Sequence, residues 1–410
     1  MKIDFRIALF VIYLFWGMIF FSVCSIFGVR YGVDETPPFY TVGIFLLLVL
    51  TIIALGRSIF SLIRDNLLFT VIFPTFVILC FLYDSAYSRT SLMQYFVYYV
   101  AFGIPSSYIG VYLARHGGIA QIGKWMDIVM IICSLGVLQA LPGIIYDSVI
   151  TLGGTSYQRL AYMSGFAFCT NVCGIFLGDN YERFSFMQSK VGKILSITLL
   201  IVQLLGCLYS GGRGGFLYLA ITSVFLFVYS NSSRNILYIV VTLLLLYYLL
   251  TRFQGTIFYD VIGRRMERTF NYITDEGGID IQNRNDVWSY SISVIKNSDS
   301  IFGLGLFRYY SFMRNTADYP YAHNLFLDFL LQGGILYFLF WVGLLAYFFK
   351  CLFRLLRKTK KQVIIVPIVL YVFIELMFSS TYLWVGLLWL SLSFVFSYHK
   401  YTKKGRYDKI

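Results

Sequence analysis

The chain alternates long apolar segments with short polar connections. A helix that crosses a bilayer needs about 20 mostly apolar residues, and twelve segments approach that length. The pattern predicts an all-α polytopic membrane protein, a single integral membrane domain over residues 1–410. Its predicted spans are 7–28, 39–56, 67–83, 95–114, 126–145, 160–178, 194–209, 216–230, 236–251, 324–349, 363–379 and 381–398.

Composition supports the same class. Hydrophobic residues make up 59% of the chain and charged residues 13%, whereas soluble proteins keep about a quarter of their residues charged. The net charge of +13 could indicate a nucleic-acid partner. The basic residues lie in short clusters between apolar segments, however, which is typical of orientation signals in membrane proteins. The first span follows Lys2 and Arg6 without a small-residue cleavage site, so we expect it to remain as an anchor.

The basic residues also predict an orientation. With the N-terminus inside, the inside segments carry 21 of the 33 Lys and Arg residues. Most of the others lie in one long segment, 252–322, and long loops cross the membrane largely regardless of charge. The sequence therefore predicts cytoplasmic termini and a large outside loop at 252–322. Its formal charge is zero, and Val287–Ile295 shows helical apolar spacing, so we expect one or two short surface helices there.

Several chemistries are excluded by missing motifs. The chain has no GxxxxGK[ST] phosphate loop and no DxD pair for a metal-bound nucleotide sugar. The predicted inside loops are too short to form a nucleotide-binding domain. Any substrate must therefore reach the outer face by itself or on a lipid. Cys169 and Cys173 are one helical turn apart without a second ligand pair, so we expect neither a disulfide nor a metal site.

A glycine-rich turn at 210–215, Ser-Gly-Gly-Arg-Gly-Gly, lies outside between two predicted spans. One interpretation is a tight helix–helix turn with an interfacial arginine. The other is an anion nest formed by backbone N–H groups, in which the guanidinium of Arg213 binds phosphate. The spacing alone leaves both open.

Other polar residues lie at the outer ends of predicted spans or in the long loop. Arg284 and Arg159 can each be an ordinary loop or interfacial charge. His323 is the only histidine predicted outside, and Asn324 after it can be a helix cap. Ionisable residues in spans usually face a polar cavity. We therefore expect a shared outer cavity, covered by the long loop, for Arg159, Arg213, His323, Asp328 and Glu375.

Four segments in order give a family resemblance. They are Arg159–Gly165 with Asn171, Ser210–Gly215, Arg284–Trp288 leading to Phe302–Gly305, and Ala322–Asn324 with Gly333–Gly334. Over about 155–350 the chain resembles the O-antigen polymerase and O-antigen ligase superfamily of bacterial envelope glycosyltransferases. The resemblance implies a GT-C-like fold in the bacterial inner membrane and an undecaprenyl-diphosphate-linked oligosaccharide as donor. It also implies transfer at the periplasmic face without a metal or cofactor, with a chain-length regulator protein as a further candidate partner.

The resemblance also suggests roles. Arg213 and Arg284, then Arg159, would bind the diphosphate, where negative charge develops. His323 would accept the proton of the acceptor hydroxyl. The possible supporting residues are Asn171, Asn324, Asp328 and Glu375. Gln332 stands where an acid is common in the family, so Asp328 or Glu375 would take any acid role.

Three functions fit these features. A polymerase would join lipid-linked O-antigen repeat units, and a ligase would move the finished chain to lipid A–core with the same donor. The 40 Phe and 34 Tyr residues, with much Ile, suggest the AT-rich coding typical of O-antigen gene clusters, which favours the polymerase. A flippase for the same lipid would more often show paired repeats and charges near mid-membrane, neither of which is evident.

Overall fold

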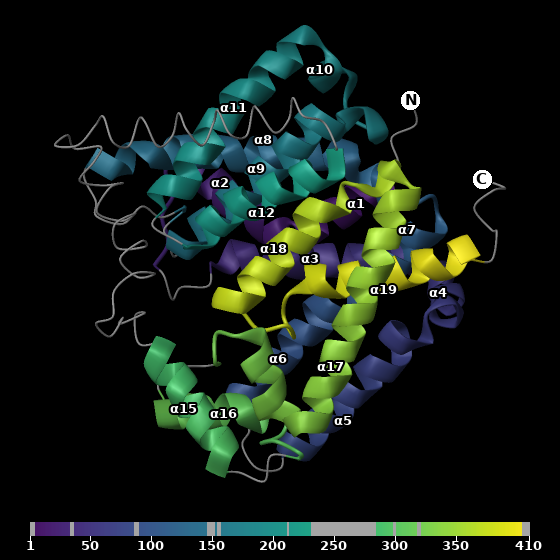
Figure 1. Cartoon of the computed structure of the whole chain (residues 1–410), viewed down its shortest axis with the longest axis vertical. Coiled ribbons are helices and arrows are strands. Elements are labelled where there is room, and N and C mark those ends of the chain that lie inside the picture. Colours follow the sequence, from purple (N-terminus) through teal and green to yellow (C-terminus); the bar gives the residue numbers. More distant parts are fainter. Residues whose placement is uncertain are drawn as a thin grey trace. The chain divides into compact units, whose positions relative to one another are not determined.

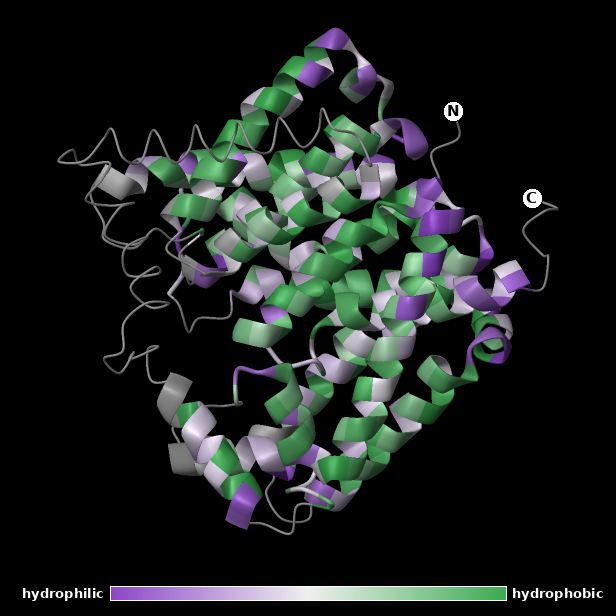
Figure 2. Cartoon of the chain, viewed as in Figure 1, coloured by the Kyte–Doolittle hydropathy of each residue, from purple (hydrophilic) through white to green (hydrophobic). Residues whose placement is uncertain are grey.

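The computed structural model describes residues 5–32, 37–85, 90–145, 152–153, 157–210, 213–230, 284–297, 301–317 and 321–403. Every regular element within these ranges is helical (Figure 1). The helices consist mainly of hydrophobic residues (Figure 2), as expected where lipid or other helices surround them. For the described residues the prediction of an all-α structure is confirmed, and the apolar helices are consistent with a multi-pass membrane protein.

Six helical segments in the described part of the chain are long and apolar enough to cross a membrane. They are Pro38–Asp65, Met93–Arg115, Ile119–Gly143, Gln158–Asn180, Lys190–Leu208 and Leu325–Lys358. The consecutive helices α1 (Phe5–Leu14) and α2 (Trp16–Ile26) make a seventh if they form one span. Shorter apolar helices cover Leu68–Asp84, Leu217–Leu226 and Ile365–Phe378. The span predicted at 236–251 lies outside the described residues, so twelve spans and a GT-C fold stay predictions.

The chain divides into two compact units. The first comprises Met1–Leu14, Gly43–Gln121 and Asp280–Ile410, and the second Phe15–Val42 and Ile122–Ile279. Helix α3 (Pro38–Leu55) has residues in both. Besides α1, the first unit contains α4 (Ile59–Asp65), α5 (Phe73–Ser85), α6 (Thr90–Tyr98), α7 (Ile104–Arg115), α15 (Arg284–Asn297), α16 (Arg308–Ala317), α17 (Leu325–Lys358), α18 (Ile365–Phe378) and α19 (Gly386–Lys403). The second contains α2, α8 (Gly123–Ala140), α9 (Tyr157–Leu177), α10 (Ser185–Gln188), α11 (Lys190–Tyr209) and α12 (Arg213–Ser230).

Short 3₁₀ or π-helical turns extend or connect these helices. They are Gly56–Ser58, Leu68–Ile72, Tyr99–Gly103, Ile119–Ile122, Leu141–Ile145, Gly178–Asn180 and Lys360–Gln362. In the long loop, α15 covers the predicted periodic stretch, and α16 is a second short helix. Both helices lie in the described part of the 252–322 segment, and the placement of this segment as an outside loop stays a prediction.

The first unit is built around α7 and α19, which pack closely. A side chain at Gly110 in α7 would place its Cβ 2.1 Å from the Ser393 hydroxyl and 2.6 Å from the Leu390 carbonyl oxygen. Glycine therefore permits the backbone approach that small residues allow in membrane helices. Beside this pair, Trp341 and Trp389 are fully buried in an aromatic core. This packing supports the start of α17, where the candidate site lies.

The second unit is centred on α9, which packs against α8, α11 and α12 and is buried along most of its length. Two glycines permit this packing. A Cβ at Gly165 would lie 2.3 Å from the Tyr218 ring of α12, and one at Gly206 of α11 would lie 2.4 Å from the Ser164 hydroxyl. Glycines thus allow α9 to pack at short distances against α11 and α12.

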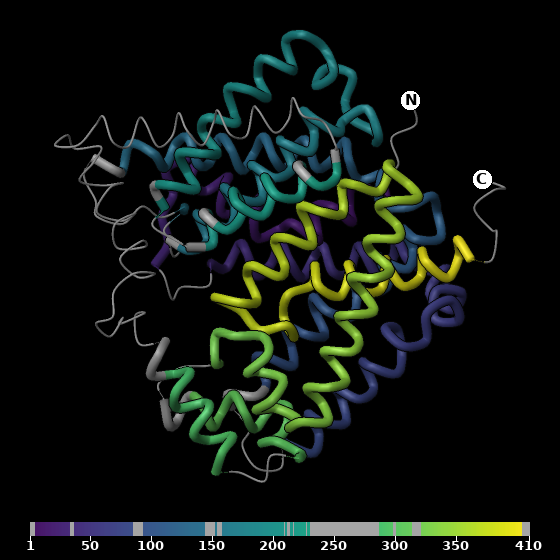
Figure 3. The backbone as a smooth tube through the Cα atoms, in the orientation of Figure 1, coloured from purple at the N-terminus to yellow at the C-terminus, as the bar shows by residue number. Residues whose placement is uncertain are grey.

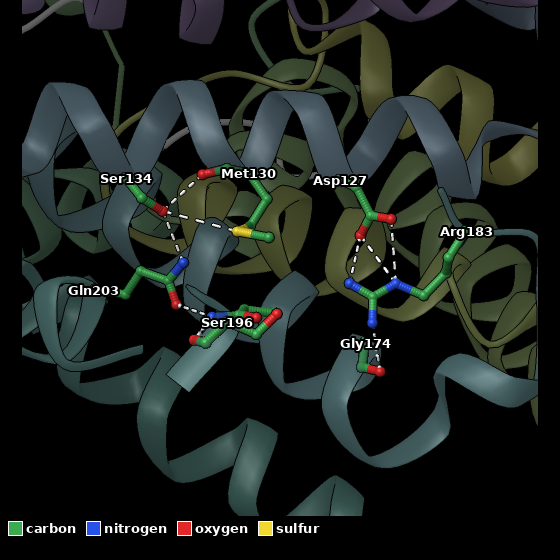
Figure 4. A network of polar contacts seen from close by, with 8 residues as sticks. Asp127, Met130, Ser134, Gly174, Arg183, Ser196 and Gln203 are labelled. Carbon is green, nitrogen blue, oxygen red and sulfur yellow. Dashed lines mark hydrogen bonds and ion pairs between the residues drawn. The ribbon is translucent and has the colours of Figure 1, made fainter. Parts of the chain in front are cut away.

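A buried ion pair connects α8 to the segment after α9 (Figure 4). Arg183 donates from Nε and Nη2 to the Asp127 carboxylate at 3.1 and 2.7 Å, and from Nη1 to the Gly174 carbonyl at 2.7 Å. Both charged side chains are nearly inaccessible, at 4% and 2% exposure. A Cβ at Gly174 would lie 2.7 Å from the guanidinium carbon, so this glycine leaves room for the arginine.

Asn171, a possible supporting residue of the predicted site, lies in the core of the second unit. Its amide donates to the Ser196 carbonyl at 2.8 Å and to Gln203 Oε1 at 3.0 Å. Gln203 in turn donates to the Ser134 hydroxyl at 2.7 Å (Figure 4). These bonds connect α8, α9 and α11, so in the structure Asn171 connects helices.

The ion pair gives a stability prediction. Asp127→Ala leaves a buried guanidinium without its carboxylate, which costs about 3–5 kcal/mol when one member of such a pair is removed. We expect a clearly lower midpoint of thermal unfolding for the purified protein in detergent. Glu182→Ala is the matched control, because it breaks the exposed Lys124–Glu182 pair at 2.8 Å, and such pairs contribute about 0–1 kcal/mol. Equal midpoints for the two variants would contradict the assigned importance of Asp127.

Candidate active site

The turn before α17, residues 321–324, contains His323, the predicted base. This segment is the histidine turn. His323 has φ 53°, and it is the one non-glycine residue with positive φ within the described residues. A non-glycine residue in this left-handed region is strained and persists only where its surroundings hold it. Its side chain is half-buried. Asn324 then caps α17, accepting from the N–H groups of Phe326 at 3.0 Å and Leu327 at 3.3 Å.

The peptide N–H just before His323 is held by two buried side chains. The Ala322 N–H donates to the Tyr309 hydroxyl oxygen at 2.6 Å and to Asp328 Oδ1 at 3.1 Å. The Tyr309 hydroxyl donates to the same carboxylate oxygen. Tyr309 and Asp328 are both completely buried. Burial, and then the neighbouring carboxylate of Asp328, raises the pKa of Tyr309 well above its usual range. The phenol therefore stays protonated and remains a donor.

The carbonyl of the same residue is held by the long loop. The indole Nε1–H of Trp288 in α15 donates to the Ala322 carbonyl at 2.9 Å. Arg284 is the first residue of α15, one turn before Trp288. The structure therefore connects the arginine-bearing helix and the histidine turn, which are two separate segments of the family resemblance, through one hydrogen bond.

Helix α16 is positioned by a buried carboxylate from α5. Asp84 Oδ2 accepts from the backbone N–H groups of Phe307 at 2.8 Å and Arg308 at 3.3 Å. These N–H groups have no intrahelical acceptor at the start of a helix, and a carboxylate there is favoured by the helix dipole. Asp84 thereby fixes the helix that presents Tyr309.

The glycine pair Gly333–Gly334 lies where the loop at 301–305 packs against α17. Gly334 has φ 67° and ψ −164°, so α17 is broken there. The Leu331 and Gln332 carbonyls accept instead from the N–H groups of Leu304 at 2.7 Å and Gly305 at 2.9 Å. A Cβ at Gly303 would lie 2.5 Å from the Gly334 nitrogen. Glycines on both sides therefore permit this contact. In Figure 3, α15 and α16 are drawn in green and α17 in a lighter green.

Gln332 belongs to a neutral network. It donates to the Tyr310 hydroxyl at 3.1 Å and accepts from the Tyr382 hydroxyl at 2.5 Å. The Tyr310 hydroxyl also pairs with Thr381 Oγ1 at 2.5 Å. Burial raises the pKa of Tyr310 well above its usual range. The amide therefore has defined hydrogen-bonding roles at the position where an acid was expected from the resemblance.

Glu375 lies near the end of α18, four residues before Ser379, which contacts the histidine turn. The Tyr321 hydroxyl donates to the Ser379 carbonyl at 2.6 Å, and Ser379 follows Glu375 by one helical turn. The rings of Tyr321 and His323 have centroids 4.4 Å apart. The end of α18 and the histidine turn are thus in the same part of the first unit.

The other two arginines lie together at one end of the second unit. Arg213 begins α12, and Gly214 after it approaches Tyr162 so closely that a Cβ would lie 2.2 Å from the ring. Tyr162 is one turn after Arg159 in α9. The Arg159 side chain is exposed, with its guanidinium carbon 4.4 Å from the centroid of the Phe21 ring.

The structure therefore gathers the predicted residues into two groups. His323, Asn324 and Asp328 share one corner of the first unit, with α15 and the end of α18 connected to it, whereas Arg159 and Arg213 share one end of the second. A shared cavity that unites both groups stays a prediction. The close packing of Gly214 supports the tight-turn interpretation of the glycine segment, and the anion nest involves Gly211 and Gly212, which lie outside the described residues.

Sequence reasoning missed three residues that hold the histidine turn: Asp84, Trp288 as a donor, and Tyr309. Their signals were weak, because Asp84 ends an apolar segment and Tyr309 lies in an aromatic-rich stretch. Trp288 belongs to a segment of the family resemblance and to the predicted helical stretch, but neither pattern indicates its hydrogen-bond partner. Their partners are far away in the sequence, so spacing carries no information about the pairing.

The described residues form a multi-pass set of apolar α-helices. In the first unit, a histidine in the left-handed region lies close in sequence to a buried acid, Asp328. Residues 198–342 match a family model described as O-Antigen ligase. The match supports the superfamily of O-antigen ligases and polymerases, without separating the two. Its range includes Arg213, Arg284, His323 and Asp328. No curated protein and no solved structure matches the chain.

The packing of the 301–305 loop against α17 can be tested at Gly303. Gly303→Ala forces a side chain into the left-handed region at φ 66° and against Gly334, which costs at least about 1–2 kcal/mol. We expect a lower midpoint of thermal unfolding in detergent. Gly343→Ala in α17 is the control, because a Cβ there meets nothing within 4 Å, and alanine is the better helix former. A Gly303→Ala midpoint as high as that of the control would exclude the proposed close contact.

Proposed function

We propose that this protein is an O-antigen polymerase, which joins undecaprenyl-diphosphate-linked oligosaccharide repeat units at the periplasmic face of the inner membrane. The observation that carries the proposal is the strained backbone of His323, held by buried groups inside the region that matches the family. Strain of this kind clusters at functional sites. The multi-pass helical structure fits a substrate carried on a membrane lipid.

In this proposal the arginines bind the leaving group. A diphosphate gains negative charge as the bond to the anomeric carbon breaks, and groups that stabilise developing charge lower the barrier most. Arg213 and Arg284 take this role, with Arg159 as a third contributor. A guanidinium is suited to it because its planar fork can donate two parallel hydrogen bonds to phosphate.

His323 acts as the general base. The oxygen of an acceptor hydroxyl attacks the anomeric carbon of the donor, and the bond from that carbon to the diphosphate oxygen breaks. The bonding electron pair leaves with the diphosphate, and the hydroxyl proton passes to the imidazole. An imidazole titrates near neutral pH, and a positioned base contributes about 10²–10⁴-fold. No metal ion is needed for these steps, because the arginines supply the positive charge.

The ligase is the second candidate, favoured by the description of the matched family. It uses the same donor and the same two types of residue, and differs in its acceptor, lipid A–core. A chain-length regulator would accompany the polymerase alone and stays a prediction from the resemblance.

A complementation experiment with His323→Ala tests the function and the base together. In a host that lacks the native gene, we expect lipid A–core that carries a single repeat unit, because ligation continues without polymerisation. The lipopolysaccharide banding pattern on a gel measures this. Complete loss of O-antigen would instead identify the ligase, and a normal ladder would remove His323 from the mechanism.

His116→Ala is the matched control for that experiment. His116 is a second histidine of the first unit, with Nδ1 2.9 Å from the Tyr112 carbonyl oxygen at the end of α7. The control should give a normal ladder. Both variants must reach the membrane in equal amounts, which an immunoblot of a tagged protein checks.

A further inference from the structure

Both backbone groups of Ala322, the residue before His323, are held by side chains from three helices, α15, α16 and α17. Its N–H donates to Tyr309 and Asp328, and its carbonyl accepts from Trp288. A residue anchored at both groups has little freedom to rotate its neighbouring peptides. The left-handed backbone at His323 follows directly after this anchored residue.

We propose that Tyr309, Asp328 and Trp288 form a clamp on Ala322 that positions the imidazole of His323 for proton transfer. The inference rests on the proposed function, because it assigns these three residues to the base of that reaction. They act through His323 and are positioning residues. Relaxation of the strained turn would move the imidazole away from the acceptor hydroxyl, and displacements of about 1 Å can cost on the order of 10²-fold in rate.

The polar contacts of Asp328 support this role. All hydrogen bonds of its carboxyl group to described residues are made by Oδ1, which accepts from the Tyr309 hydroxyl and the Ala322 N–H. The other carboxylate oxygen is buried without a hydrogen-bond partner among the described residues. Burial of a polar atom in this way is costly. A carboxyl group retained at such a cost, which bonds to Ala322 and to the tyrosine that itself bonds to Ala322, is explained by holding the turn.

The clamp also connects the base to the leaving-group side of the site. Trp288 lies one turn after Arg284 in α15, so its bond to Ala322 relates the start of α15 to the histidine turn. Tyr309 is held in turn by α16, whose first N–H groups are bound by Asp84. The position of His323 therefore depends on α15 and α16, the two helices in the described part of the 252–322 segment.

Two neighbouring tyrosines provide a sharp test. Tyr309→Phe and Tyr310→Phe each remove one hydroxyl from a completely buried ring of α16. The Tyr309 hydroxyl contacts the clamp, whereas the Tyr310 hydroxyl contacts Thr381 and Gln332. The assay is chain growth on synthetic lipid-linked repeat units by the full-length protein in liposomes, with kcat and KM measured separately.

We expect Tyr309→Phe to lower kcat by about tenfold or more with KM for the lipid-linked unit unchanged, and Tyr310→Phe to stay within about twofold of the unaltered protein. Trp288→Phe should also lower kcat, because it removes the donor to Ala322. All variants should keep similar unfolding midpoints. Equal kcat losses for the two tyrosine variants, or a higher KM with unchanged kcat, would overturn the clamp.

His323→Ala separates failure of the clamp from failure of the proposed function. If His323→Ala is inactive while Tyr309→Phe retains full kcat, the base assignment stands and the clamp is wrong. If His323→Ala retains full activity, the proposed base is wrong. The clamp proposal then fails as well, because it assigns the three residues to positioning that base.

Discussion

The break of α17 at Gly334 is the constraint on which the described active-site corner depends. Surrounded by apolar side chains, a backbone carbonyl that loses its helical donor must find another one. The Leu331 and Gln332 carbonyls find theirs in Leu304 and Gly305. These hydrogen bonds fix the loop before α16. Tyr309 of α16 then bonds to Asp328 and Ala322. A single non-helical residue thereby determines where the loop attaches and how the histidine turn is held.

Much of the fold could be predicted because the membrane imposes simple rules. Apolar segments of sufficient length gave helices, and Asn324 gave the cap of α17, since both depend on local sequence. The periodic stretch around Trp288 gave α15 for the same reason. The pairing of Asp84 with α16 could not be predicted, because the partners are 223 residues apart. Gln332 likewise shows its role only once Tyr310 and Tyr382 are in place around it.

The four weak sequence segments are physically interdependent in two cases. Gly303 lies against Gly334, and Trp288 bonds to the residue before His323. Each segment alone has an ordinary explanation, such as a turn, a cap or a packing glycine. Their occurrence together supports the resemblance, because each segment contacts another of the four. The arginine segments of the second unit are related in the same way, through Gly214 and Tyr162.

The distance in sequence between Asp84 and its donors has a consequence for biosynthesis. The donors are made 223 residues after the carboxylate, a delay of about 10–45 seconds at 5–20 residues per second. During that interval α5 must exist with an acidic side chain that has not yet met α16. The corner around His323 is consequently completed late in synthesis, after most of the helices have been made. A chain that stalls before α16 would carry an unsatisfied carboxylate, a feature by which membrane quality control could recognise it.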